Sequence, residues 1–488
     1  MGDENTVLDE THARHLLRRA TFGASRDELA RLGLVGLSRG AAADALLALR
    51  TKRFRAAGPY FERAHAKWIK YLVKGKTPVQ DRVVLFWHDH FSVSFSKVGD
   101  LRLMGDYVKA LYAHGLGNFR DLVKEMNRTV AMMEFLDTVR NFKEVPNENY
   151  ARELCELFTL GVLDSAGNAN YSQEDVVQIA RAFTGWNRNR RKAVFLDFLH
   201  DYQVEFPERG PKVLFPGAHG FPSGGASFTT GGEGPGEIDE VVDILLQHRD
   251  TDGRNTVSRR VARRLLEYYA YPDPELTVVD EVVAASGFDV DFDIRALLRA
   301  IFTHDAFYEA AAAAPFGAGT RKSVRWPVDY VVSALRLLRM RLKGGEQVLD
   351  GGSYRGITDH CGNMGQHLLD PPSVFGWDWE EGWLSTANLL GRYVFARDLS
   401  VARWGSKRFR PELFVDFDLT DPNAIVEAVA DALDVVHHLD ASTRTTLLDY
   451  LTDGGAVSSV NLHDPYYGDV KLRGLFALVL QSPAFLFH

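Results

Sequence analysis

The chain has 488 residues, of which 45% are hydrophobic and 25% charged, and its formal net charge is −8. A chain of this length buries a large core without disulfides or structural metals, and its acidic balance argues against nucleic acid as a partner. Cys155 and Cys361 are the only cysteines, which excludes a disulfide framework and a zinc site of the CxxC type. We expect both thiols to be free and buried.

Residues 1–23 are acidic and then amphipathic, without the basic and apolar regions of a secretory signal. No window reaches about 18 uninterrupted apolar residues, so no membrane span is expected. These features predict a soluble, cytoplasmic protein as the sequence stands, and an exported one only if a signal has been removed.

Helical periodicity dominates the first part of the chain. Apolar residues recur at spacings of three and four in five segments, residues 26–37, 58–75, 77–88, 102–128 and 172–186. Ser172, followed by Asp175 three residues later, predicts a capped helix start. No repeat of fixed period is present, which argues against a solenoid.

Residues 188–236 alternate aromatic and polar residues and then become rich in glycine and proline, which predicts a short hairpin and a long irregular loop. Helices are expected again over 237–345, a second irregular loop with prolines and tryptophans over 346–383, and closing helices over 384–488. We therefore predict an all-α fold: one multi-helix domain over 1–488, with N-terminal helices in 1–187, two long irregular loops and at most a short β-hairpin.

The segment LFWHDHFSVS, residues 85–94, places His88 and His90 between aromatic side chains. On a helix, residues at i and i+2 lie about 200° apart, so both imidazoles can bind one metal only if the helix before them has ended. Imidazole is a common ligand of zinc and iron, and Trp87 and Phe91 would shield such a site from water. The alternative is that the histidines cap helix carbonyls or pack beside the aromatic rings.

The segment PNENYARELCELFTLG, residues 146–161, predicts a helix with a polar face. Asn149, Glu153 and Glu156 line this face at spacings of four and three. Two glutamates at i and i+3 resemble helical carboxylate metal sites, although these normally use Glu-x-x-His and the histidine is missing here. The alternative is the solvated face of an ordinary amphipathic helix.

Three further groups have candidate roles. His200 and Asp201, in the first irregular region, offer a metal ligand, a general base or a turn. One predicted helix carries four arginines, Arg259, Arg260, Arg263 and Arg264. Such an array can bind a phosphate or sulfate, or can form salt bridges to acidic helices. The second loop contains three tryptophans, Trp377, Trp379 and Trp383. They could form a platform for a sugar or peptide, or pack against the last helices. Walker, dinucleotide-binding and HExxH motifs are absent from the sequence.

Taken in order, these stretches resemble the bacterial family catalogued as domain of unknown function 1800. The matching pieces span nearly the whole chain: HLLRRATFGASRDEL, FWHDHF, AMMEFLD, NENYARELCELFTLGV, YSQEDVVQIARAFTGW, FLHDYQVEF, VSRRVARRLLEYY, RKSVRWPVDYVVSALR, MGQHLLDPPSVFGW and LVLQSPAFLF. The resemblance implies no established activity. It does imply one site assembled from the HDH motif, the NENYARE motif and the His200–Asp201 pair.

The chain departs from the family pattern at Phe158, where the resemblance implies a histidine. If that histidine is a ligand, this chain has lost one, and its metal or chemistry differs. The resemblance also implies an exported protein, and a sulfatase-like protein as its partner.

The leading hypothesis is a metal-dependent enzyme, either a hydrolase or an oxygen-using enzyme. Its expected cofactor is a divalent metal, zinc, iron or manganese, and its expected ligands are His88, His90, Glu153 and Glu156. Catalysis is assigned to four residues, Glu153, Arg152, His200 and Asp201, with Arg152 orienting a carboxylate or binding an anionic substrate.

The competing hypothesis is a non-catalytic helical module that binds a partner protein or a glycan through the tryptophan loop. In that case the NENYARE motif is a structural network in which Arg152 pairs with Glu148 and the asparagines bind backbone groups. A metal-free acid–base enzyme that uses Glu153 and His90 is a third interpretation, which the sequence does not separate from the first.

Overall fold

The structure is a computed structural model that describes residues 3–48, 61–75, 78–218, 220–228, 233–312, 322–340, 351–401, 403–404 and 407–488. The start of the predicted helix 58–75, residue 77 of the predicted helix 77–88 and the first residues of the predicted loop 346–383 lie outside these ranges. In the described part of the chain, α-helices predominate, which confirms the all-α class.

In its described residues, the N-terminal part folds into nine helices in succession. They are α1 (Glu10–Ala20), α2 (Arg26–Leu32), α3 (Arg39–Leu47), α4 (Phe61–Lys74), α5 (Pro78–His90), α6 (Phe95–Val98), α7 (Leu101–His114), α8 (Phe119–Arg128) and α9 (Val130–Phe135). Helix α5 is buried along its whole length, so its apolar and polar side chains all face other elements.

The middle part mixes helices with short strands. It contains η1 (Thr138–Arg140), α10 (Asn149–Glu153), η2 (Leu154–Thr159), α11 (Gln173–Ala182), β1 (Trp186–Asn189), β2 (Lys192–Phe195), η3 (Asp197–Leu199), η4 (Pro207–Arg209), β3 (Val213–Leu214), β4 (Ala226–Ser227), α12 (Glu237–Leu245), α13 (Thr256–Tyr269), α14 (Leu276–Ser286), α15 (Ile294–Thr303) and α16 (Asp305–Ala312). The predicted start of α11 is confirmed, because Ser172 and Asp175 exchange side-chain and backbone hydrogen bonds in a capping box.

The C-terminal part is again helical. It contains α17 (Pro327–Leu337), α18 (Gly351–Asn363), η5 (Glu380–Leu384), α19 (Thr386–Ser400), β5 (Arg403–Trp404), β6 (Lys407–Arg408), η6 (Pro411–Leu413), α20 (Pro422–Ala432), α21 (Ala441–Leu451), η7 (Tyr466–Lys471), α22 (Leu472–Gln481) and α23 (Pro483–Leu486). We call residues 364–385, between α18 and α19, the Pro/Trp loop.

Helix α18 corrects the prediction of an irregular chain over 346–383. Its glycines gave no helical signal, but Ile357, Cys361 and Met364 are fully buried at spacings of four and three. This apolar stripe packs on α4, and tertiary packing outweighs the poor helix propensity of glycine. Cys155 and Cys361 are both free and buried, as expected.

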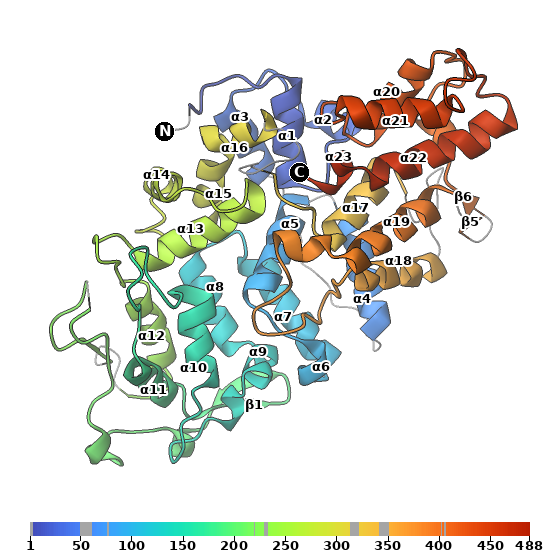
Figure 1. Cartoon of the computed structure of the whole chain (residues 1–488). Helices are drawn as coiled ribbons and strands as arrows, with labels where there is room; N and C mark the ends of the chain where they lie inside the picture. Colours follow the sequence, from blue (N-terminus) through green and yellow to red (C-terminus); the bar gives the residue numbers. More distant parts are fainter. Residues whose placement is uncertain are drawn as a thin grey trace.

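In the ranges that the structure describes, the strands form three antiparallel pairs, β1 with β2, β3 with β4, and β5 with β6. The hairpin expected in the first irregular region is β1–β2, in which Trp186 lies opposite Phe195, and the two other pairs have two residues in each strand. The segment from β1 to β4 lies at the opposite end of the molecule from α20–α22 (Figure 1). Buried hydrophobic residues form one contiguous cluster from Leu8 to Leu486. In the described residues, no helix is both long and apolar enough to span a membrane.

Candidate functional site

Helix α5 continues through both histidines of the HDH motif. The amide of Phe91 donates to the carbonyl of Trp87 at 2.9 Å, so the backbone is still helical at His90. The side chains at i and i+2 therefore leave the helix about 200° apart. His88 and His90 are not brought together, although a shared metal requires that they be.

The imidazole of His88 is fully buried, and both of its nitrogens have partners. Its Nε2 accepts from the amide of Leu369 at 2.9 Å, and its Nδ1 lies 3.0 Å from the hydroxyl of Tyr107. Because Nε2 accepts, we assign the proton to Nδ1. Burial, and then the neighbouring His65, lower the pKa of His88 to about 3. His65 of α4 accepts from Leu368 at 3.1 Å, so two neutral imidazoles bind successive amides of the Pro/Trp loop.

His90 is enclosed by aromatic rings. Its Nε2 lies 3.1 Å from the carbonyl of Phe158 and donates to it, while its ring stacks on Phe86 with 5.9 Å between centroids. Burial, and then the charge of Arg264, lower the pKa of His90 well below its usual range. The ring of Phe158 lies 6.3 Å from that of His90, so the position where the family pattern implies a histidine borders this imidazole.

Asp89, between the two histidines, binds the Pro/Trp loop, and sequence reasoning did not assign it a role. Its carboxylate accepts from the Trp377 amide at 2.8 Å, from the Trp379 indole at 3.1 Å and from Arg264 at 3.1 Å. A Cβ at Gly376 would lie 2.2 Å from Asp89 Oδ1, so only glycine permits this approach. Burial raises the pKa of Asp89 to about 6, against the opposing effect of Arg264. The signal available in the sequence was a charged residue inside an apolar run.

The NENYARE motif forms α10, which widens directly into a π-helical turn, η2. In this turn the amide of Leu160 donates at 2.9 Å to the carbonyl of Cys155, five residues earlier. Single π-turns inside helices are rare and frequently lie at functional sites. The turn follows Glu153 directly and contains both Glu156 and Phe158.

Arg152 is bound on the outer side of α10. Its Nη2 lies 2.9 Å from the carboxylate of Glu148 and 2.9 Å from the amide oxygen of Gln173. The amide of Asn149 donates to the side chain of Asn147 at 3.0 Å. These are the contacts that the structural interpretation of the motif requires of Arg152 and the asparagines.

Glu153 and Glu156 are half-buried, and their carboxylates differ in their contacts. Glu156 accepts from the hydroxyl of Tyr171 at 3.3 Å. Glu153 has no hydrogen-bond or ion-pair partner in the part of the chain that the structure describes. Burial, and then the charge of Glu156, raise the pKa of Glu153. A carboxyl group with a raised pKa and without a partner is suited to donate a proton.

Helix α13 packs against η2 and carries the arginine array. Arg259 binds three carboxylates, and Arg263 binds Glu267 and Asp273, so salt bridging accounts for these two residues. Arg260 donates to the carbonyl of Leu157 at 3.3 Å, while its Nε has no partner among the described residues.

A cavity of about 190 Å³ opens beside Arg260, between α13, the start of α14 and the segment after η2. Its other lining residues include Leu160, Asp164, Thr256 and Leu276. Burial, and then the charge of Arg264, lower the pKa of Arg260 to about 10, while Glu156 is one of the carboxylates that oppose this shift. Arg260 thus lines the cavity and interacts electrostatically with Glu156.

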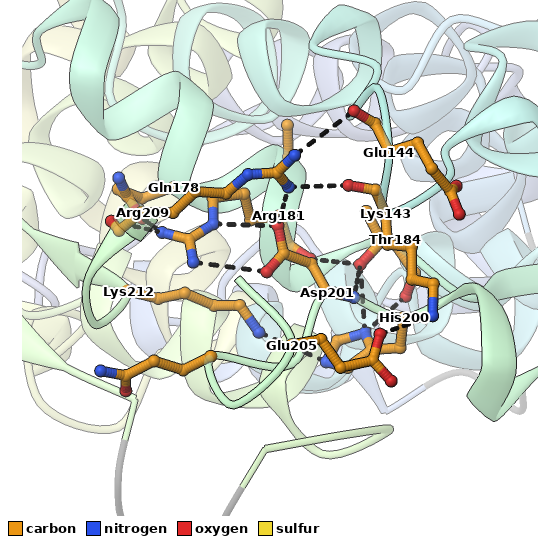
Figure 2. Close-up of polar contacts among 12 residues, drawn as sticks. Lys143, Glu144, Gln178, Arg181, Thr184, His200, Asp201, Glu205, Arg209 and Lys212 are labelled. Atoms are coloured by element: carbon orange, nitrogen blue, oxygen red, sulfur yellow. Dashed lines mark hydrogen bonds and ion pairs between the residues drawn. The ribbon is translucent and has the colours of Figure 1, made fainter. Parts of the chain in front are cut away.

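His200 and Asp201 belong to a different, fully enclosed cluster. Asp201 lies between Arg181 and Arg209, at 3.1 Å and 2.6 Å, as Figure 2 shows. His200 lies 3.0 Å from Glu237, whose carboxylate also binds Lys212 at 2.8 Å. The side chains of Asp201, His200 and Glu237 are 0% exposed. Among the described residues, no hydrogen bond or ion pair joins this cluster to Glu153 or to the HDH motif.

The predicted ligand set is therefore divided between three places. His88 and His90 bind different backbone groups, and Glu153 and Glu156 lie where α10 passes into the π-turn. No group of three or more His, Cys, Asp or Glu residues in the described ranges is placed to hold a metal. In the Pro/Trp loop, Trp377 and Trp383 are buried, and Trp379 stacks under Arg264 with 4.3 Å to its ring centroid.

Comparison with known proteins identifies the family. The chain belongs to the family described as Protein of unknown function (DUF1800), whose model matches residues 15–487. Searches of curated proteins and of solved structures gave no match.

Proposed function

We propose that this DUF1800 protein is an enzyme that uses Glu153 and Glu156 as an acid–base pair. The observation that carries the proposal is the half-buried Glu153 carboxylate, which lacks a partner among the described residues and has a raised pKa. Glu156, fixed by the Tyr171 hydroxyl, is the accompanying base. Two carboxyl groups in different environments are a common arrangement for hydrolysis.

Arg260 is the group that binds the substrate in this proposal. Arg152 is held by Glu148 and Gln173, whereas Arg260 has an unpartnered Nε beside the cavity. We infer that an oxygen acceptor of the substrate, such as a carboxylate or an ester carbonyl, binds Arg260 while the reacting bond lies over Glu153. The anion-orienting role predicted for Arg152 then belongs to Arg260.

The divalent metal stays a prediction, and in this proposal its expected ligands are reduced to Glu153 and Glu156. Both imidazoles of the HDH motif are held by backbone or hydroxyl groups, so carboxylate oxygens are the donors that remain. Of zinc, iron and manganese, manganese best matches oxygen ligands. Such a metal would supply an activated water, with most of its coordination positions left open.

A mutant panel tests the proposal. Wild-type protein, purified without a histidine tag, is assayed against ester, glycoside, phosphate-ester and sulfate-ester substrates with and without manganese. Glu153→Gln should lower any activity found by at least about a hundredfold, the usual contribution of a general acid. Glu148→Gln, which removes the same charge from the outer side of the motif, is the matched control and should retain it. Full activity in Glu153→Gln would reject the proposal.

Metal analysis separates the two forms of the mechanism. Bound metal that is lost in the Glu153→Gln, Glu156→Gln double variant but kept in the His88→Ala, His90→Ala variant supports the carboxylate site. Metal that is lost only in the His88→Ala, His90→Ala variant would instead support a metal site at the two histidines. The sulfatase-like partner, and a non-catalytic binding role for the Pro/Trp loop, stay predictions. For the binding role, the 65% exposed Phe375 is the side chain to replace.

A further inference from the structure

Arg325 lies just before α17, and its guanidinium is fully buried. None of its three nitrogens has a hydrogen-bond partner in the described ranges of the chain. The guanidinium lies over the ring of Phe485, 4.5 Å from its centroid, so carbon atoms cover one of its faces. A buried charged donor without an acceptor is strongly unfavourable, and buried charges in proteins are normally paired.

The buried carboxylates nearest to Arg325 bind other cations. Asp329, four residues further along the chain, lies 2.7 Å from Arg82. Asp434 lies about as close to two guanidinium groups of α1, those of Arg14 and Arg18. Neither of these carboxylates forms an ion pair with Arg325.

The region as a whole contains more buried cations than carboxylates. Helix α1, helix α5, the segment before α17 and helix α19 supply seven buried cationic residues, Arg14, Arg18, Arg19, Arg82, Lys322, Arg325 and Arg392. The carboxylates that act on them are fewer, Glu10, Asp329, Asp431, Asp434 and Glu380. Arg392 also has two unpartnered nitrogens, its Nε and Nη1.

The acid–base behaviour of neighbouring groups agrees with an excess of positive charge. Burial, and then the charge of Arg82, lower the pKa of Arg19 to about 9. Burial, and then the charge of Arg18, lower the pKa of Lys322 to about 8. These groups would bind their protons more tightly if a negative charge lay among them.

We infer that Arg325 binds a small inorganic anion of the chloride class as a structural part of the fold. The guanidinium is fully buried, which favours a small monovalent ion over a phosphate or an organic anion with a larger desolvation cost. The ion would lie where the segment before α17 meets the C-terminal segment, because the amide of Arg325 donates to the carbonyl of Leu486 at 2.9 Å and its guanidinium covers Phe485. This site is separate from the one proposed for catalysis.

Crystals of the wild-type protein grown with bromide in place of chloride locate the ion directly. The expected result is an anomalous bromide peak within about 3.5 Å of the Arg325 guanidinium, the contact distance of a halide with an N–H donor. Bromide peaks only at the protein surface would overturn the inference. This measurement needs no variant, so it does not depend on whether an Arg325 variant folds.

Thermal unfolding tests the same site in solution. At constant ionic strength, replacing fluoride by chloride should raise the melting temperature of the wild-type protein by about 2–5 °C per hundredfold rise in chloride above its dissociation constant. Arg325→Met, which keeps the length of the side chain and removes its charge, should lose this dependence. Arg120→Met, on the partly exposed face of α8, is the control and should keep it. Equal chloride dependence in the wild type and in Arg325→Met would overturn the inference.

Discussion

Two polar clusters of this protein, both made from motifs that attract attention in the sequence, have opposite properties. In the cluster of His200 and Asp201, each negative charge binds two cationic side chains or a cation and an imidazole, and the carboxylates are closed to solvent. At the end of α10, just before the π-turn, the Glu153 carboxylate is half-exposed and has no partner in the described part of the chain.

The difference separates groups that stabilise a fold from groups that are free to react. A buried and fully paired network holds segments together, because every polar atom in it has exchanged water for protein partners. A partly exposed carboxyl group that lacks partners contributes little to stability and can exchange protons with a ligand. Polarity in the sequence does not distinguish the two cases, whereas the contacts do.

The largest effect is expected at the closed cluster. Asp201→Asn should lower the free energy of unfolding by about 3–5 kcal/mol, because it leaves the Arg181 guanidinium buried without its counter-charge. Urea denaturation at pH 7 measures the change. Glu205→Gln, which breaks the exposed pair of Glu205 with Lys143 in the same loop, is the control and should change stability little. A loss below about 1 kcal/mol in Asp201→Asn would contradict a structural role for the network.

An intermediate, pH-dependent effect is expected at Asp89, which is closed to solvent but has a raised pKa. Its folded-state pKa of about 6 exceeds the ordinary value of 3.8, so the folded protein takes up a proton before the unfolded chain does. The contribution of Asp89 to stability is therefore fully present below its unfolded pKa and is lost as the pH rises through about 6.

The stability of the wild type relative to Asp89→Asn should consequently be greater at pH 4.5 than at pH 7.5, by on the order of 2 kcal/mol. Urea denaturation of both proteins at the two pH values isolates the contribution of Asp89 to the free energy of unfolding. The contributions of the other titrating groups cancel in the difference between the two proteins. Asp378→Asn, on the exposed side of the same loop, is the matched control and should show no such change. A difference independent of pH would contradict the raised pKa.

The fold class was predictable because helical periodicity is a local property. Apolar residues at spacings of three and four predicted α5, α11 and α13 without reference to the rest of the chain. Helix α18 was not predictable in this way, because its glycines give no periodic signal and its stability comes from Ile357 and Cys361 packed on another helix. The hairpin between Trp186 and Phe195 was indicated by its composition, but its strand pairing was not.

The contacts of the candidate site were not predictable, because they join distant parts of the chain. The partner of His88, Leu369, lies 281 residues away, and Arg264 lies 175 residues from Asp89. The two histidines attracted attention because imidazole binds metals, yet an imidazole equally serves a buried backbone amide. Glu153 is less conspicuous in the sequence, and its lack of partners is visible only in three dimensions.

The smallest effect is expected at Glu153, and it bears most directly on the comparison. Because burial raises the pKa of Glu153, its charged form is disfavoured in the folded protein at neutral pH. Glu153→Gln should therefore leave the free energy of unfolding at pH 7 unchanged or raise it by about 0.5 kcal/mol, as is common when a functional group is removed. Glu148→Gln removes the same charge but breaks a hydrogen-bonded pair with Arg152, so its stability should fall slightly instead. Parallel urea titrations of the two variants compare the signs, and a clear loss of stability in Glu153→Gln would assign Glu153 to the structural class of His200 and Asp201.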